Sequence, residues 1–309
     1  MIDLIEDSGN CPLATMVSKE VLESTLGRDM TVTWKAAGIF LKRHWLFTGL
    51  LLFVIIVSMT TRALERLFVY YPTKDVDTSP SMVGLHYQDI FLVTEDKVRL
   101  HGWFVPHPKS RSTLLVFHGN AGNIGHRVHW IKMLHEAAGH VLIIDYRGYG
   151  KSEGQPFEEG LYRDARAAYE WWTRERAASG EKLVLVGESI GGSVAVDLAS
   201  RRPVTGLILQ SPFTTAWDMA KTILPIGLLQ PIARVHFDSV AKIAGIRCPK
   251  LIIHGNRDEI VPFRMGKKLY DLAQPPKQFY EVPGAGHNDL PWVAGGDYIA
   301  RLRDFLQSL

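Results

Sequence analysis

The sequence predicts an α/β protein with a mostly parallel, doubly wound sheet covered by helices on both faces. Short apolar runs rich in β-branched residues, such as the one within 182–186, have the composition of strands buried on both faces. They alternate along the chain with segments of helical periodicity, and this alternation is typical of right-handed βαβ crossovers. The 309 residues are 46% hydrophobic and 22% charged. A chain of this length can form one large domain or two average ones, and the hydrophobic content is sufficient for a sizeable core.

The expected elements follow one another from residue 85 onward, in a domain that we expect to cover 85–309. Two antiparallel strands come first, at 89–94 and 97–105. Further strands are expected at 113–118, 141–145, 182–186, 206–210, 250–254 and 278–282. Helices are expected at 124–138, 158–178, from 193 onward, at 264–272 and from about 292 to the end. The insertion at about 211–248 is expected to form a small helical cap.

The N-terminal part of the chain has a different composition. Residues 1–44 are weakly patterned, and we expect a poorly ordered tail. Residues 45–61 contain no charged side chain, and this length is at the short end of what spans a bilayer. We therefore expect a retained transmembrane helix, with a buried core helix as the alternative. Residues 62–84 are expected to be a linker. The cations around 45–61 favour a single-pass topology with the domain at 85–309 on the non-cytoplasmic side.

Composition and spacing argue against several classes of function. The formal net charge is +3 and no block of lysine and arginine is interleaved with aromatics, so no nucleic-acid partner is expected. Cys11 and Cys248 form neither a disulfide framework nor a metal site. His126 and His129 lie three residues apart with no third ligand nearby in the sequence, so surface or packing histidines are favoured over a zinc site.

The central motif is Gly187-x-Ser189-x-Gly191, between an apolar strand and a helix of small residues. A sharp turn at this junction strains the backbone of the serine and presents its hydroxyl at the carboxyl end of the strand. The flanking glycines let strand and helix approach closely. The alternative is a glycine-rich turn with an incidental serine. As a nucleophile, Ser189 needs a general base and an acid that orients the base.

The acid and the base are sought at other strand ends, where the reacting groups of such sheets lie. Asp258 follows the strand at 250–254, and His287 follows the strand at 278–282. The chain order serine, aspartate, histidine is that of the α/β-hydrolase triad. Glu259 is the rival acid. Asp289 is expected to cap the final helix instead.

A tetrahedral intermediate needs two preorganised hydrogen-bond donors. The backbone N–H of Ile190 is one candidate, because it directly follows the nucleophile. The backbone N–H of Asn120 is the other, in the loop at 118–123 after the first fully apolar strand. A plain glycine turn is the alternative interpretation of this loop.

Five motifs together resemble one subgroup of the α/β-hydrolases, the bud-emergence-type or α/β-hydrolase-domain-13-like group of membrane-anchored serine hydrolases. They are FHGNAGNIGHR (117–127), DYRGYGKSEG (145–154), GESIGGSVA (187–195), HGNRDEIVP (254–262) and GAGHND (284–289). The resemblance covers residues 62–309 and implies the α/β-hydrolase fold. It carries the triad onto Ser189, Asp258 and His287, and the oxyanion donors onto Asn120 and Ile190. Glu188 departs from the arginine usual in animal relatives, which bears on substrate preference.

The expected function is that of a membrane-anchored serine hydrolase that cleaves carboxylic ester or thioester bonds through an acyl-enzyme. The resemblance to a group similar to protein depalmitoylases implies an acylated small molecule, lipid or protein as substrate. No metal or organic cofactor is expected. A serine peptidase, an acyltransferase and a non-catalytic binding protein are the alternatives. Apolar residues of the cap, Phe213, Trp217, Met219 and 223–229, are expected to line an acyl pocket, rest on the membrane or pack internally.

Overall fold

The computed structural model describes residues 48, 52, 65–66, 68–223 and 235–309. The chain divides into two compact units, Met1–Thr60 and Thr61–Leu309, and the second contains the fold described below. The tail at 1–44 and, apart from Thr48 and Leu52, the expected membrane segment at 45–61 lie outside the described residues. Within the described ranges, no helix combines the length and the apolar character that crossing a bilayer requires.

The second unit is built around a sheet whose described strands have the order β10-β9-β8-β7-β4-β6-β3-β2. The strands are β2 (Gln88–Val93), β3 (Arg99–Val105), β4 (Ser112–Phe117), β6 (His140–Ile144), β7 (Lys182–Glu188), β8 (Gly206–Gln210), β9 (Lys250–Gly255) and β10 (Lys277–Val282). β3 pairs antiparallel with β2 and with β6, and the remaining pairs are parallel. The mostly parallel sheet predicted from the alternating pattern is therefore confirmed.

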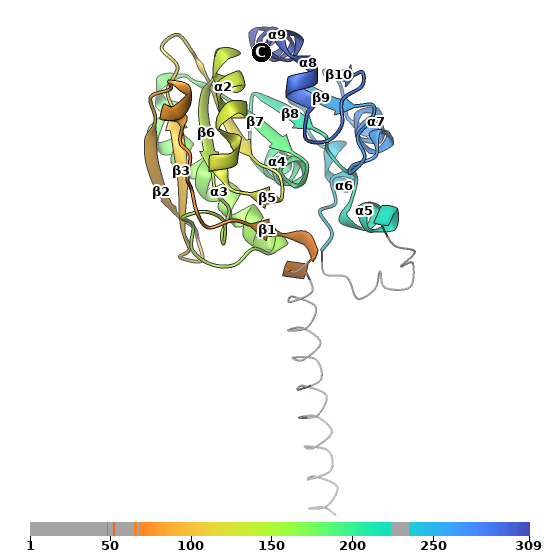
Figure 1. Ribbon diagram of the computed structural model, residues 1–309, viewed down its shortest axis with the longest axis horizontal. Helices are drawn as coiled ribbons and strands as arrows, with labels where there is room; N and C mark the ends of the chain where they lie inside the picture. Colours follow the sequence, from red (N-terminus) through yellow and green to blue (C-terminus); the bar gives the residue numbers. More distant parts are fainter. Residues whose placement is uncertain (1–47, 49–51, 53–64, 67, 224–234) are drawn as a thin grey trace, which may run out of the picture. The chain divides into compact units, whose positions relative to one another are not determined.

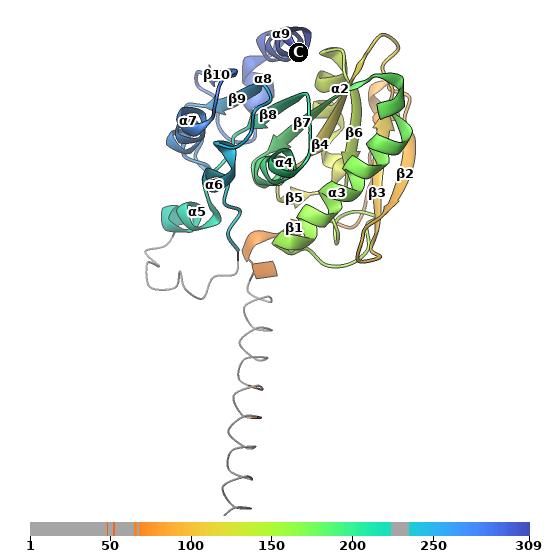
Figure 2. The same cartoon turned by 180° about the vertical axis from the view of Figure 1, so that it is seen from behind.

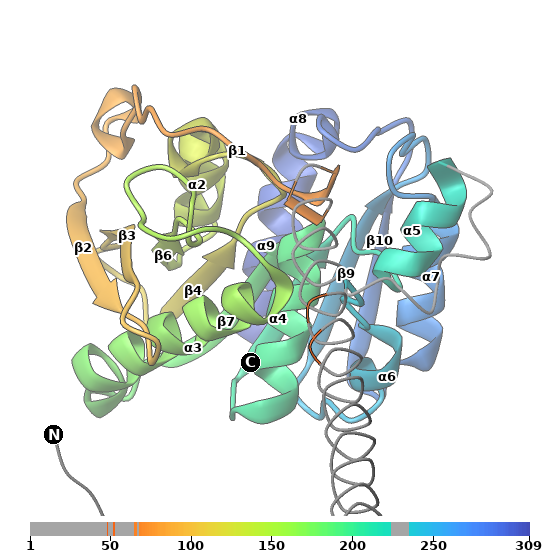
Figure 3. The ribbon, with the colours of Figure 1, turned by 90° about the horizontal axis from the view of Figure 1, so that it is seen from below.

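Helices cover both faces of this sheet (Figures 1 and 2). Along β4, Leu115 and Phe117 belong to one core cluster and Leu114 and Val116 to the other, as the two-residue period of a strand requires. The first cluster includes residues of α3 (Glu158–Glu175), α4 (Ile190–Arg201), α6 (Val240–Ile243) and α7 (Phe263–Leu272). The second includes residues of α2 (Val128–Glu136), α8 (Leu290–Ala294) and α9 (Gly296–Ser308). In Figure 3, α7 lies near β9 and β10, and β2 and β3 lie at the opposite end of the sheet.

Several helix boundaries differ from those expected, and three of them bear on the site or the C-terminus. The helix expected at 124–138 starts as a 3₁₀ turn, η2 (Ile124–Arg127), which the side chain of Asn123 caps by accepting from the Gly125 N–H. α4 begins at Ile190 and not near 193, so it starts directly after Ser189. The last helix is interrupted at Gly295, whose φ of 52° ends α8 before α9 begins.

The described residues of the expected linker at 62–84 are part of the second unit. Within them, β1 (Tyr71–Pro72) pairs in parallel with β5 (Ala121–Gly122), beside which it lies in Figure 1. A short 3₁₀ turn, η1 (Pro80–Val83), follows. A linker was expected because a two-residue strand that ends in proline is too short to have a recognisable period.

The cap expected at 211–248 contains α5 (Ala216–Ile223) and α6 among its described residues, while residues 224–234 lie outside them. Phe213 is buried in the first core cluster and packs edge-on against Phe237. Phe213 therefore packs internally, which is one of the three roles expected for the apolar residues of the cap.

Candidate active site

Ser189 lies between the end of β7 and the first residue of α4, with φ 53° and ψ −116°. This left-handed conformation is unfavourable for a residue with a side chain and persists only where the surrounding structure enforces it. Its N–H donates to the Gln210 carbonyl oxygen at 2.9 Å, which fixes the turn to the end of β8. The strained turn predicted at the Gly-x-Ser-x-Gly motif is present, and it holds the half-buried Ser189 at the carboxyl end of its strand.

The two glycines of the motif allow close backbone contacts. A Cβ atom on Gly187 would lie 2.4 Å from the Gly191 carbonyl oxygen, so strand and helix approach each other without a side chain between them. A Cβ atom on Gly191 would lie 2.0 Å from the Phe117 carbonyl oxygen and 2.8 Å from that of His118. The start of α4 is therefore in direct contact with the loop that follows β4.

Asp258 and His287, which the sequence predicts as the acid and the base, lie next to each other and are hydrogen-bonded. His287 Nδ1 lies 2.8 Å from Asp258 Oδ2, and both side chains are buried. The other carboxylate oxygen, Oδ1, accepts the backbone N–H groups of Ile260 at 3.0 Å and Val261 at 2.7 Å. Burial raises the pKa of Asp258, but the hydrogen bonds from His254 and His287 outweigh it and hold the pKa below its ordinary value. The carboxylate is thus ionised and oriented toward His287.

The two other acids near this pair have different positions. Glu259 is exposed, and its carboxylate lies beside Gly286. Asp289 stands at the N-cap position of α8, not of the final helix, and makes no capping hydrogen bond. Its Oδ1 accepts the Gly286 N–H at 2.7 Å instead, which braces the loop that carries His287.

Ser189 and His287 follow β7 and β10, which point in the same direction within the sheet. Their loops therefore lie at the same edge of the sheet. Among the described residues, no hydrogen bond joins Ser189 to His287. Such bonds are often long in ligand-free active sites and shorten only when substrate is bound.

The two expected oxyanion donors lie on elements that touch each other. Ile190 is the first residue of α4, and the first N–H groups of a helix have no acceptor within it. Asn120 follows the β4 strand in the loop that contacts Gly191. Its N–H has no acceptor among the described residues. The sequence predicts both groups as oxyanion donors, and neither N–H has an acceptor among the described residues.

Glu188, the residue before the nucleophile, joins these two elements. Its Oε2 accepts the Gly119 N–H at 3.1 Å and lies 3.3 Å from Nε of Arg127. Arg127 in turn donates through Nη2 to the Ala121 carbonyl oxygen at 2.9 Å. Glu188 and Arg127 therefore connect the nucleophile turn to the loop that carries Asn120. The sequence singled out Glu188 only as a departure from the related group.

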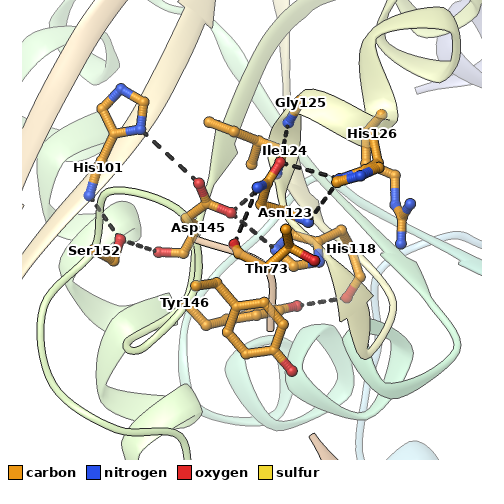
Figure 4. A network of polar contacts seen from close by, with 12 residues as sticks. Thr73, His101, His118, Asn123, Ile124, Gly125, His126, Asp145, Tyr146 and Ser152 are labelled. Atoms are coloured by element: carbon orange, nitrogen blue, oxygen red, sulfur yellow. Dashed lines mark hydrogen bonds and ion pairs between the residues drawn. The ribbon is translucent and has the colours of Figure 1, made fainter. Parts of the chain in front are cut away.

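A buried polar network lies under the same loop (Figure 4). Asp145 is fully buried, with Oδ1 3.6 Å from His118 Nε2 and Oδ2 3.9 Å from His101 Nδ1. His101 Nε2 is bonded to Asp89 at 2.6 Å. His118 Nδ1 donates to the Gly119 carbonyl oxygen at 2.7 Å. The Gly119 carbonyl and the Asn120 N–H belong to one trans peptide and point in opposite directions. His118 therefore helps to orient the Asn120 N–H.

Replacing Asp145 by asparagine is expected to lower the free energy of unfolding at pH 7 by about 3 kcal/mol, because two buried histidines lose their carboxylate partner. Burial raises the pKa of Asp145, but the neighbouring imidazoles of His101 and His118 and the hydrogen bond from the Ile124 N–H outweigh it and keep the pKa below its ordinary value of 3.8. A carboxylate with a lowered pKa stabilises the fold above its unfolded-state pKa, and this contribution is lost as the pH falls through the folded-state value.

The difference in the free energy of unfolding between wild type and Asp145→Asn should therefore become smaller below about pH 4. Denaturant unfolding at pH 7 and at about pH 3 measures it. Asp304→Asn on the exposed side of α9 is the matched control and should change stability at neither pH. An Asp145→Asn difference that stays constant between the two pH values would contradict the expectation.

Sequence reasoning missed several residues that surround the site. His254 is fully buried, and its Nε2 lies 2.9 Å from the Val261 carbonyl oxygen and 3.3 Å from Asp258 Oδ2, so it also holds the acid in place. In the sequence, Asp145 stands out only as the first residue of the motif at 145–154. The available signal was that both polar residues stand at the carboxyl end of an apolar strand, where a polar side chain has no packing role.

The chain is similar to known proteins over most of its length. A family model described as "Serine aminopeptidase, S33" matches residues 108–242. A protein of Mycobacterium tuberculosis whose function is uncharacterised is 37% identical over 244 residues, which are 78% of this chain and 87% of that protein. Protein bem46 of Schizosaccharomyces pombe is 37% identical over 238 residues, which are 74% of this chain and 79% of the yeast protein.

Among solved structures, an esterase of Pyrococcus furiosus has a similar fold. It superposes with a TM-score of 0.65 at 22% sequence identity, covering 77% of this chain and 98% of the esterase. At this identity the likeness concerns the fold. An esterase thus has the same type of fold, with a mostly parallel sheet.

Proposed function

We propose that this chain, which belongs to the α/β-hydrolase superfamily and to its bem46-type, or α/β-hydrolase-domain-13-like, group, hydrolyses carboxylic ester or thioester bonds through an acyl-enzyme on Ser189. The chain is a serine hydrolase related to esterases. The observation that carries the finer proposal is the hydrogen bond of 2.8 Å between His287 Nδ1 and Asp258. It leaves Nε2 of the same imidazole as the proton acceptor that a serine nucleophile requires.

In the proposed reaction, the Ser189 hydroxyl attacks the acyl carbon while Nε2 of His287 takes its proton. The oxyanion of the tetrahedral intermediate accepts hydrogen bonds from the N–H groups of Asn120 and Ile190. When the intermediate collapses, the bond to the leaving group breaks and His287 protonates the departing alcohol or thiol. Water, deprotonated by His287, then attacks the acyl-serine ester. The bond to Ser189 Oγ breaks, His287 returns the proton to that oxygen, and the acid is released. Asp258 stabilises the imidazolium that forms in each half of the reaction.

The proposed substrate is an acyl ester or thioester of a small molecule, a lipid or an acylated protein, handled at a membrane. The support for membrane attachment is the uncharged sequence at 45–61, and the support for a non-cytoplasmic catalytic domain is the charge pattern around it. Accessibility of a cysteine placed at position 200 to an impermeant thiol reagent in sealed vesicles tests the topology. Labelling of that cysteine only from the cytoplasmic side would overturn it.

The direct test of the proposed function is labelling of the full chain in detergent with a fluorophosphonate probe. Wild type should be labelled, Ser189→Ala should not, and His287→Ala should be labelled at a strongly reduced rate. Ser200→Ala is the matched control, because Ser200 lies on the same helix with its hydroxyl bonded to the Asp197 carbonyl oxygen. Folded wild-type protein that resists the probe, or Ser189→Ala that still reacts, would refute the mechanism.

The type of bond that is cleaved can be assigned with wild-type enzyme that has not been treated with the probe. The family model that matches residues 108–242 bears the name of an aminopeptidase, and the same triad can attack amides. A panel of p-nitrophenyl esters, thioesters and aminoacyl p-nitroanilides compares kcat/KM directly. The proposal requires the esters or thioesters to be the better substrates, and a preference for the anilides would replace it with a peptidase.

A further inference from the structure

We infer that the β1 segment, defined as residues 68–75, is a positioning element of the oxyanion hole. Its backbone holds the loop that carries Asn120, so that the N–H of this residue stays directed to the place where the oxyanion forms. The inference rests on the proposed function, because it assigns a role within the same reaction. The β1 segment lies outside residues 108–242, the part of the chain that the family model matches.

Asn120 is held from three directions. The Tyr71 N–H donates to the Asn120 carbonyl oxygen at 3.1 Å. The Asn120 side chain donates through Nδ2 to the Val69 carbonyl oxygen at 3.0 Å. The Tyr149 hydroxyl donates to the Asn120 carbonyl oxygen at 2.7 Å. Two of these three bonds come from the β1 segment, and none of them uses the Asn120 N–H.

The β1 segment also holds the far end of the loop. The Thr73 N–H donates to the Gly122 carbonyl oxygen at 3.0 Å. The Asn123 side chain donates to the carbonyl oxygens of Thr73 at 3.0 Å and of Asp75 at 2.7 Å. Asn123 is fully buried, and its Oδ1 caps the turn that follows. The loop from Asn120 to Asn123 is thus bonded to the segment along its whole length.

The β1 segment is itself fixed to the core. Tyr70 is only 3% exposed, and its hydroxyl donates to Glu65 Oε1 at 2.9 Å. The same carboxylate oxygen accepts the Glu158 N–H at the start of α3 at 3.1 Å. The ammonium group of Lys74 donates to the Ser152 carbonyl oxygen at 3.1 Å. A segment anchored at both ends can act as a rigid support for the loop.

This loop needs external support because it is not part of the main sheet. β4 ends at Phe117, and after it the backbone is held by contacts from other elements. An oxyanion donor contributes to catalysis only when it is oriented before the charge develops. A misplacement of about 1 Å in an active site can lower the rate about 100-fold. Loss of a bond from the β1 segment should therefore affect kcat more than KM.

The test uses the full chain in detergent and the matched pair Tyr71→Pro and Tyr71→Phe. Proline removes the N–H that bonds Asn120. Phenylalanine keeps it and loses only the hydroxyl of a residue that is 52% exposed, whose bond to the Phe68 carbonyl oxygen does not involve the oxyanion loop. Tyr71→Pro should lower kcat about 10- to 100-fold and leave KM within about twofold. A boronic acid that mimics the tetrahedral intermediate should bind more weakly by the same factor. Tyr71→Phe should behave as wild type in both measurements.

If Tyr71→Pro does not fold, Asn120→Ala tests whether the β1 segment positions the Asn120 N–H. It removes the bond to Val69 but keeps the Asn120 backbone N–H, and it should also lower kcat with little change in KM. An unchanged kcat in folded Tyr71→Pro, or in Asn120→Ala when the proline variant cannot be folded, overturns the inference. In that case wild type would still be labelled by the fluorophosphonate, so the proposed function would stand. Absence of labelling in wild type would refute the function itself.

Discussion

Asp258→Asn is expected to lower kcat by about 10⁴-fold, because it leaves the imidazole of His287 in the wrong tautomer. The backbone N–H groups of Ile260 and Val261 both donate to Oδ1 of Asp258. In the variant, the same two donors require the amide oxygen of the asparagine to occupy the position of Oδ1. The amide nitrogen then occupies the position of Oδ2, 2.8 Å from His287 Nδ1. Because an amide NH₂ only donates, Nδ1 has to accept, and the imidazole proton moves to Nε2, where it blocks the serine.

A second contact reinforces this outcome. His254 Nε2 donates to the Val261 carbonyl oxygen and lies 3.3 Å from Asp258 Oδ2, so it would also face the amide nitrogen of the variant. Two donors would then point at each other in a buried site, and the free energy of unfolding should fall by about 1–3 kcal/mol. Turnover of a p-nitrophenyl ester and denaturant unfolding measure the two effects separately.

Glu259→Gln is the control for this substitution, because Glu259 is the neighbouring acid but is exposed, whereas the carboxylate that is hydrogen-bonded to His287 belongs to Asp258. It should retain the activity of wild type within about twofold, as surface substitutions usually do. The assignment of Asp258 as the acid would be wrong if Glu259→Gln lost activity to the same extent, or if Asp258→Asn kept it.

The positions of the main site residues could be predicted because each one follows a strand that is recognisable by itself. β7, β9 and β10 carry apolar or alternating patterns, and parallel strands bring their carboxyl ends to one edge. Local sequence and topology therefore predict Ser189, Asp258 and His287 as the site residues. The catalytic roles of these residues remain predictions until the variants are measured.

The surroundings of the site could not be predicted in this way. β1 and β5 have two residues each, and a strand of this length has no measurable period. Its partner lies some fifty positions away, so only the folded structure brings Tyr71 to Asn120. The network of Asp145 likewise joins residues of β3, the end of β4 and the end of β6. Such contacts depend on the register between strands, which a single sequence does not specify.

Gly191→Ala is expected to have the second large effect, and it tests the contact between the nucleophile turn and the oxyanion loop. The added Cβ atom would lie 2.0 Å from the Phe117 carbonyl oxygen, a backbone atom held in the central sheet. One of the two elements must move. Overpacking of this kind costs about 1–3 kcal/mol or more of the free energy of unfolding. The displacement separates Ser189 from the Asn120 N–H, so the rate of fluorophosphonate labelling should fall by about 100-fold.

Gly192→Ala supplies the matched control one residue along the same helix. There the nearest atom to an added Cβ is the Pro212 Cβ at 3.4 Å, which is an ordinary contact. Alanine is favoured over glycine in a helix by about 0.5–1 kcal/mol, so this variant should be as stable as wild type or slightly more stable. Thermal unfolding and the labelling rate compare the two variants. Equal behaviour of Gly191→Ala and Gly192→Ala would mean that the backbone contact at Phe117 does not hold the oxyanion loop against the nucleophile.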